Sequence, residues 1–118
     1  MDKKILIVED DMSISEALTE LLTYEGFTVL QAFNGQEALD RLKSGYRPDL
    51  ILLDLMMPIL DGIGFRNEQL KSHLFSHIPV IILSADGNIK SKAEQVKVAN
   101  YIKKPVDIDH LINVVNSI

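Results

Sequence analysis

The sequence DLILLDLMMPILDG, at residues 49–62, contains four consecutive large apolar residues followed by a carboxylate. The apolar run 50–53 is too short for a helix and has no polar face, which predicts a strand buried on both sides, as in a parallel sheet. Pro58 and the Asp-Gly pair that follows it indicate a turn. Asp54 therefore stands where a buried strand opens to solvent, the usual place for ligands and chemistry in an open α/β sheet.

Strand and helix signals alternate along the rest of the chain. Apolar runs predict buried strands, and a mixed pattern predicts an edge strand at the second position. The five predicted strands are residues 5–8, 27–32, 50–53, 80–83 and 100–103. Because the segments between them carry helical signals, the strands must be parallel, with right-handed crossovers and helices on both faces. The sequence thus predicts a three-layer, doubly wound α/β domain over residues 1–118.

Capping residues and apolar spacing place the helices. Three helix starts are indicated by polar caps, two of them with capping-box spacing: Ser13 with Glu16, Asn34 with Glu37, and Asp107. Two helix ends are indicated by glycines: Gly26 and Gly45. The third helix, expected from Gly62 to about Ser72, has only a thin apolar stripe: Ile63, Leu70 and Leu74, with Phe65 to one side. The last helix has a clear apolar face: Ile108, Leu111, Ile112, Val115 and Ile118.

Composition limits the function. The 118 residues are 47% hydrophobic and 25% charged, as in a globular protein, and include no cysteine, which excludes disulfides and thiol catalysis. The net charge of −5, without a basic cluster, disfavours direct nucleic-acid binding. No apolar run approaches a membrane span and no signal-peptide pattern is present. We therefore expect a cytoplasmic protein that contacts neither nucleic acid nor membrane.

Polar residues follow four of the predicted strands. Because the strands of a parallel sheet all point the same way, their carboxyl ends lie along one edge, where ligands bind in open α/β sheets. That edge is expected to gather five residues: Glu9, Asp10, Asp54, Ser84 and Lys104.

Four sequence blocks resemble the signature of the receiver domain of two-component response regulators. They are Val8-Glu9-Asp10-Asp11, Asp54-Leu55-Met56-Met57-Pro58 with Asp61-Gly62, Ser84-Ala85 and Lys104-Pro105. An Asp-Gly or Lys-Pro pair alone is common, but here the blocks occur in the family's order on the expected elements, and the similarity covers essentially the whole chain. The resemblance, which is to the single-domain, chemotaxis-regulator type, implies a flavodoxin-like sheet of strand order 2-1-3-4-5.

The resemblance implies phosphorelay chemistry centred on Asp54. This residue would be the phosphoacceptor that attacks the phosphorus of a phosphohistidine on a sensor histidine kinase or a phosphotransfer protein. A Mg²⁺ or Mn²⁺ ion would be bound by Asp10, Asp54 and the backbone carbonyl of Met56, with Glu9 reaching it directly or through water. Lys104 would bring a positive charge to the phosphoryl group.

A signalling switch is implied as well. Ser84 would donate its hydroxyl to the new phosphoryl group, and a reorientation of Tyr101 would accompany that movement. The surface of the last two helices and the fifth strand would then act on a downstream protein target or effector domain. Three residues would flank the phosphoryl group: Met56, Ala85 and Asp86. Such a protein would catalyse only its own phosphorylation and dephosphorylation.

Other interpretations are compatible with single features of the sequence. Asp54 alone fits a strand-end turn, and Tyr101 fits a packed core aromatic. An aspartate-nucleophile phosphatase would need a second Asp two residues after Asp54, where this chain has Met56. A flavodoxin-like cofactor binder would need a phosphate loop where the chain has three consecutive acids, which would repel the phosphate. The chain could also be a receiver domain cut from a larger hybrid kinase or transcription factor.

Two stretches depart from the family pattern. Arg66 and Gln69 fall where the third helix usually has apolar core residues, so we expect Leu70 to replace them by a small rotation of the helix. The segment before the fifth strand is shorter than usual, and residues 99–101 replace a common Gly-Ala stretch, which predicts a short, shifted or mobile fourth helix built on Ala93 and Val96. The last helix has no Lys or Arg, so the charged pairing that dimerises the winged-helix branch of the family is expected to be absent.

Overall fold

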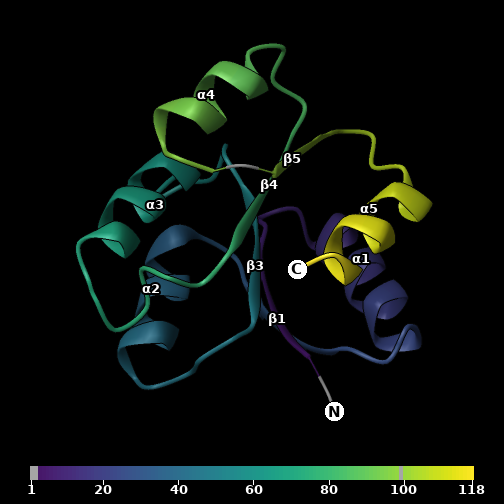
Figure 1. Ribbon diagram of the computed structural model, residues 1–118, viewed down its shortest axis with the longest axis horizontal. Coiled ribbons are helices and arrows are strands. Elements are labelled where there is room, and N and C mark those ends of the chain that lie inside the picture. The colour runs from purple at the N-terminus through teal and green to yellow at the C-terminus, as the bar shows by residue number, and fades with distance from the viewer. Residues whose placement is uncertain (1–2, 99) are drawn as a thin grey trace.

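Five parallel strands form a single sheet at the centre of the molecule. The structure is a computed structural model that describes residues 3–98 and 100–118 (Figure 1). The strands are β1 (Lys4–Val8), β2 (Thr28–Ala32), β3 (Leu50–Asp54), β4 (Val80–Ser84) and β5 (Asn100–Lys103). Their order in the sheet is β2-β1-β3-β4-β5, with every pair parallel. The predicted three-layer fold and strand order are confirmed.

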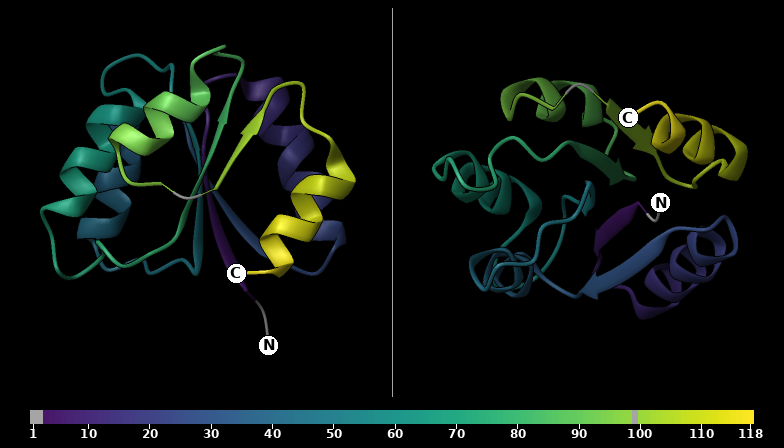
Figure 2. Two further views of the ribbon diagram at one scale, coloured as in Figure 1. Left: turned by 45° about the horizontal axis from the view of Figure 1, so that its top comes forward. Right: turned by 60° about the horizontal axis from the view of Figure 1, so that its bottom comes forward.

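Helices cover both faces of the sheet. They are α1 (Met12–Tyr24), α2 (Gly35–Lys43), α3 (Gly62–Leu70), α4 (Ile89–Gln95) and α5 (Ile108–Asn116). Figures 1 and 2 show α1 and α5 on one face, and α2, α3 and α4 on the other. None of the described helices is long and apolar enough to cross a membrane.

The core divides into two halves because neighbouring residues of a strand point to opposite faces. Along β3, Ile51 and Leu53 pack with the cluster under α2, α3 and α4. Leu50 and Leu52 pack with the cluster under α1 and α5. All four side chains are fully buried, which explains why this strand has no polar face.

Several predicted helix boundaries are confirmed, but the predicted start of α1 is wrong. At the start of α2, Asn34 accepts a hydrogen bond from the Glu37 amide, as predicted. Gly26 follows the end of α1 and has a φ of 96°, as expected for a glycine that ends a helix. The predicted Ser13 cap is wrong, because Asp11 accepts the hydrogen bond from the Ile14 amide and the helix begins one residue earlier than Ser13. Asp11 stands two residues before Ser13, and both residue types cap well.

The predicted face of α3 is also wrong. Leu70 and Leu74 are 38% and 59% exposed, whereas Phe65, Arg66 and Gln69 are buried. The expected rotation that would bury Leu70 does not occur, because hydrogen bonds to backbone carbonyls make burial of Arg66 and Gln69 possible. The helix ends at Leu70, slightly before the predicted end.

The fourth helix is short, as predicted, and the fifth is only partly buried. α4 has seven residues and buries Ile89 and Ala93. α5 buries Leu111 and Val115, but Ile108 is 51% exposed, so this part of the predicted apolar face is wrong. The prediction at Ala99 lies outside the described residues.

Gly62 lets α3 begin directly against the end of β3. Its amide donates to the Leu55 carbonyl at 3.0 Å, and a Cβ at this position would lie 2.4 Å from the Asp54 carbonyl oxygen. We expect Gly62→Ala to lower the free energy of unfolding by about 2 kcal/mol, because backbone must move to admit the methyl group. Urea denaturation measures this loss. Gly87→Ala, with no atom within 4 Å of its added Cβ, is the control, and an equal loss in both variants would contradict the steric explanation.

Candidate functional site

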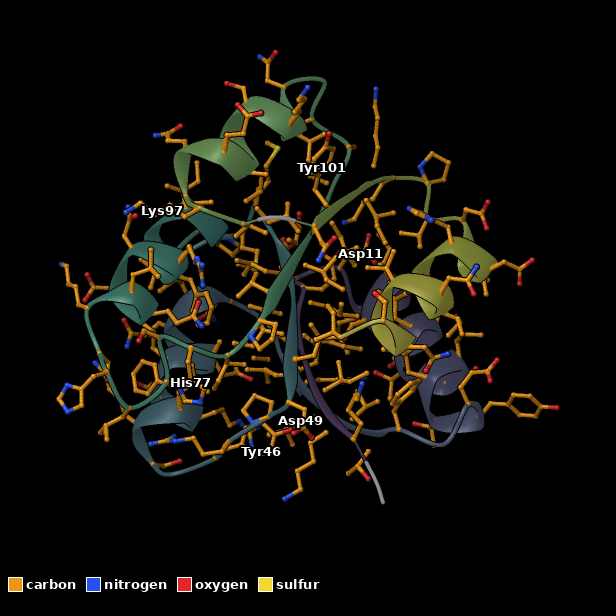
Figure 3. All side chains as sticks on the ribbon, in the orientation of Figure 1. Asp11, Tyr46, Asp49, His77, Lys97 and Tyr101 are labelled. Carbon is orange, nitrogen blue, oxygen red and sulfur yellow. The ribbon has the colours of Figure 1, made fainter. Side chains whose placement is uncertain are left out.

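Three carboxylates meet at the carboxyl edge of the sheet. Glu9 and Asp10 follow β1, and Asp54 is the last residue of β3. One oxygen from each lies within 4.8 Å of the other two. Glu9 and Asp54 are buried, whereas Asp10 is exposed. In Figure 3, Asp11 and Tyr101 mark this end of the sheet, and Tyr46 and Asp49 mark the opposite end.

Lys104 is the cation of this cluster. Its Nζ lies 2.5 Å from Glu9 Oε1 and 3.8 Å from Asp54 Oδ2. Burial raises the pKa of Glu9 above its ordinary value, and the hydrogen bond from Lys104 acts in the opposite direction. The ammonium group therefore offsets part of the cost of placing acids together in a partly closed site.

Backbone amides donate to the side chains of both Asp54 and Ser84. The Met56 amide donates to Asp54 Oδ1 at 3.3 Å, while the Met56 side chain is exposed. Ser84 is buried, and its Oγ accepts from the Asp86 amide at 3.1 Å. Asp86 itself pairs with Lys92, whose hydrogen bond holds the pKa of that carboxyl below its ordinary value.

Of the remaining residues near this end of the sheet, Asp11 contacts the cluster through its backbone amide, which donates to Glu9 Oε2 at 3.3 Å. Tyr101 is 37% exposed, so it is not the packed core aromatic of the alternative interpretation. Asp11 caps α1 and is exposed. Ala85 and Lys104 both line a neighbouring groove.

Two contacts at this edge were not predicted from the sequence. Lys92 in α4 forms an ion pair with Asp86, which precedes the helix. The two residues are not three or four positions apart, so the spacing rule for ion pairs within a helix does not predict the contact. The Gly35 amide donates to the Leu60 carbonyl at 2.9 Å, which ties the loop after Asp54 to the start of α2. A Cβ on Gly35 would lie 2.5 Å from that carbonyl oxygen, so the close approach depends on glycine. An isolated glycine after an N-cap residue carries no signal for such a contact.

The oxygen set fits a small, hard divalent cation. Carboxylates are ligands of the kind that Mg²⁺ and Mn²⁺ prefer. Among residues 3–98 and 100–118, this is the one group of three or more His or acidic side chains placed closely enough to share a metal ion. A cation would also reduce the repulsion between the three carboxylates.

An apolar groove of about 490 Å³ opens beside Lys104, and we call it the α1–α5 groove. It is lined by Ile14, Ala17, Leu18, Leu21, Ala85, Lys104, Pro105, Val106 and Ile108. Ile108 is half-exposed on its rim. The groove therefore places apolar surface next to the charged cluster.

Comparisons with known proteins agree on one family. The family model described as the response regulator receiver domain matches residues 5–116. The transcriptional regulatory protein CrdR of Helicobacter pylori is 37% identical over 113 residues, which are 94% of this chain and 52% of CrdR. The receiver domain of the Francisella response regulator 1452 is 34% identical with a TM-score of 0.88, over 98% of this chain and 95% of that one.

A phosphorylated relative has the same fold. The cyanobacterial phytochrome response regulator RcpA, solved in its phosphorylated form, is 30% identical with a TM-score of 0.83, over 99% of this chain and 91% of that one. The chain spans about half the length of the curated relatives it matches first. The match over residues 5–116, together with the shared fold, shows that the chain belongs to the response regulator receiver domain family of two-component signalling.

Proposed function

We propose that Asp54 accepts a phosphoryl group from a phosphohistidine on a sensor histidine kinase or a phosphotransfer protein. The observation that carries this proposal is the cluster of Glu9, Asp10 and Asp54 with Lys104 at the carboxyl edge of the sheet. It combines a nucleophilic carboxylate, a set of hard oxygen ligands and a cation within one small site.

The transfer forms one bond and breaks another. A carboxylate oxygen of Asp54 forms the new P–O bond, while the P–N bond of the phosphohistidine breaks and its electron pair returns to the imidazole. The Met56 amide, which donates to Asp54 Oδ1, orients the carboxylate. Lys104 stabilises the charge on the phosphoryl oxygens, because its ammonium group already lies 3.8 Å from Asp54.

Mg²⁺ or Mn²⁺ is the proposed cofactor. Asp10, Asp54 and the Met56 carbonyl would hold the ion, with Glu9 directly or through water. When bound, the ion neutralises charge on the transferring phosphoryl group, which is the main source of catalysis in phosphoryl transfer. Asp54 can then react without the full repulsion of its two acidic neighbours.

The proposed output begins at Ser84. Its hydroxyl oxygen accepts from the Asp86 amide, so its own proton is available for a phosphoryl oxygen. Movement of Ser84 toward the phosphoryl group would be accompanied by reorientation of the half-exposed Tyr101 on β5. The proposed result is a population shift of the α4–β5–α5 surface, which acts on a downstream protein or effector domain. Met56, Ala85 and Asp86 would flank the phosphoryl group.

The proposal also concerns whether the chain acts by itself or as one unit of a longer protein. Because the chain spans about half of its relatives, a receiver unit within a longer regulator or kinase is a second form of the same proposal. We place its action in the cytoplasm, through protein partners. A phosphatase is disfavoured because Met56 stands where the general acid/base would be needed.

The direct test is incubation with a small phosphodonor and Mg²⁺, followed by intact-mass measurement. We expect one added phosphoryl group, lost on treatment with hydroxylamine and absent when EDTA removes the metal. Steady hydrolysis of phosphomonoesters without a stable adduct would instead favour an aspartate-nucleophile phosphatase.

A protein donor must also contact the surface around Asp54, and the α1–α5 groove offers apolar area there. We expect Ile108→Ser to slow phosphoryl transfer from a phosphotransfer protein about tenfold, because a half-exposed apolar side chain on the rim is lost. Labelling by a small phosphodonor should stay unchanged. Tyr24→Ser is the control, since Tyr24 is exposed at the far end of α1. Equal slowing with both donors would exclude a docking role for Ile108.

A further inference from the structure

Arg66 is a buried cation whose partners are neutral groups. It is 8% exposed, and none of the ion pairs found in the described part of the chain includes it. Its Nε donates to the Val96 carbonyl at 3.0 Å, its Nη2 to the Lys97 carbonyl at 3.0 Å, and its Nη1 to Gln69 Oε1 at 2.8 Å. Hydrogen bonds of this kind offset the cost of burying the guanidinium group.

The two carbonyls belong to the end of α4. Val96 is the C-cap residue of α4, and Lys97 follows it with a φ of 59°. Carbonyl groups at a helix C-terminus lack intrahelical partners and carry partial negative charge, so a cation is favourable there. Arg66 on α3 therefore satisfies the open end of α4 and the turn toward β5.

Gln69 fixes the other side of this arrangement. Its Nε2 donates to the Phe75 and Ile78 carbonyls, both at 3.1 Å, in the segment between α3 and β4. With the amide nitrogen committed to these two acceptors, its oxygen faces Arg66. The side chains of Arg66 and Gln69 thus connect α3, the segment before β4 and the end of α4. We call this pair the α3–α4 clamp.

Besides the clamp, α4 is held by a short apolar face, in which Ile89, Ala93 and the C-cap residue Val96 join the core cluster. It is seven residues long, Asn88 gives no side-chain cap, and only Ile89 and Ala93 of its residues are buried. A helix of this length is not stable by itself and depends on tertiary contacts. At its start, Lys92 pairs with the half-buried Asp86, and at its end the carbonyls bind Arg66.

α3 joins the clamp to the loop that follows Asp54. Asp61 caps α3, and the Gly62 amide donates to the Leu55 carbonyl. Arg66 lies about one helical turn beyond Gly62. We propose that Arg66 is a positioning residue that fixes the end of α4 and the turn after it relative to the Asp54 loop. The positioning itself is independent of phosphotransfer, whereas its role in signalling rests on the function proposed above.

Hydrogen–deuterium exchange on the unphosphorylated chain tests the positioning. In Arg66→Met, we expect amides 92–98 to exchange about 10- to 100-fold faster, because charged hydrogen bonds to the end of α4 are lost. Amides of β1 and β3 should keep their wild-type rates. Arg66→Lys, which keeps the charge but cannot reach all three acceptors, should restore part of the protection.

Arg47→Met is the matched control. Arg47 also donates to two carbonyls, those of Leu42 and Tyr46, but at the end of α2. It should accelerate exchange near residues 42–46 and leave 92–98 unchanged. Unchanged exchange at 92–98 in Arg66→Met, or equal acceleration in β1 and β3, would overturn the proposal. Should Arg66→Met fail to fold, Arg66→Lys decides between the same outcomes.

A second arm separates the clamp from the phosphotransfer proposal. With a small phosphodonor and Mg²⁺, Arg66→Met should gain the same single phosphoryl group as the wild type. Phosphorylation should change exchange at 92–98 in the wild type, and this change should be smaller in Arg66→Met because the segment is already released. If neither protein takes up a phosphoryl group, the proposed function fails, while the exchange result without donor still decides the positioning of α4.

Discussion

Replacing Asp54 by Asn should reduce phosphoryl uptake by on the order of 10⁴-fold or more, to the background of the assay. The amide oxygen of Asn is a poor nucleophile, and the substitution also replaces one of the proposed carboxylate ligands of the metal by a neutral, weaker one. The free energy of unfolding should not fall, because the three carboxylates lie within 4.8 Å of one another and repel each other. The substitution removes one of these negative charges. Loss of the label would therefore report on chemistry at this residue.

Intact-mass measurement after incubation with a small phosphodonor and Mg²⁺ follows this change. Asp49→Asn is the matched control, because Asp49 is an exposed aspartate that precedes the same strand at its other end, where it accepts from the Lys4 amide. This variant should take up one phosphoryl group at the wild-type rate. Label that persists in Asp54→Asn, or uptake that is unaffected by EDTA, would exclude Asp54 as the metal-dependent acceptor.

The sheet was predictable because its signal is local. Runs such as 50–53 are apolar on both faces, and the structure buries each of these residues completely. Parallel strands place Glu9, Asp54 and Lys104 at one edge of the sheet, since each residue stands at the end of, or just after, one strand, and the strand order brings them together there. The order of the strands came from the family resemblance, because residue patterns alone do not determine which strands are neighbours.

The buried face of α3 was not predictable by the same rules. Those rules assign apolar residues to the core, whereas Arg66 and Gln69 are buried by virtue of carbonyl acceptors on Val96, Lys97, Phe75 and Ile78. These acceptors are backbone carbonyls, which every residue has, so the sequence does not indicate which of them will face α3. The sequence likewise does not show that Lys104 lies closer to Glu9 than to Asp54, because this depends on the conformations of the side chains.

Lys104 links the stability of the site to its chemistry, and its two roles oppose each other. Without metal, it pairs with the buried Glu9 and offsets the acidic charge. During transfer, the same ammonium group is proposed to stabilise the phosphoryl oxygens. A cation bound by the acids would compete with Lys104 for Glu9, so metal binding should release the ammonium group toward the substrate.

Lys104→Met is expected to slow phosphorylation of Asp54 by about 10²- to 10³-fold while strengthening Mg²⁺ binding roughly tenfold. The first effect follows from the loss of the cation that faces the phosphoryl group. The second follows because a positive charge no longer repels the metal or occupies Glu9. Quantitative phosphorylation kinetics and calorimetric Mg²⁺ titration measure the two effects separately. Lys103→Met, at the exposed neighbouring position on β5, should change neither quantity.

The same variant has an expected pH signature in metal-free buffer. Removing Lys104 leaves Glu9 buried without its partner, so the pKa of Glu9 should rise further above its ordinary value of 4.5. A carboxyl group with a raised folded-state pKa stabilises the fold below its unfolded pKa, and this contribution is lost as pH rises through the folded pKa. Lys104→Met should therefore be about 3 kcal/mol less stable than wild type at pH 7, but close to wild type below pH 4.5, where Glu9 is neutral in both.

Urea denaturation in metal-free buffer with EDTA, across this pH range, tests the difference. Adding Mg²⁺ at pH 7 should restore stability, because a bound cation replaces the missing charge. A stability difference that is the same at both pH values would show that Lys104 acts on the fold through packing rather than through Glu9.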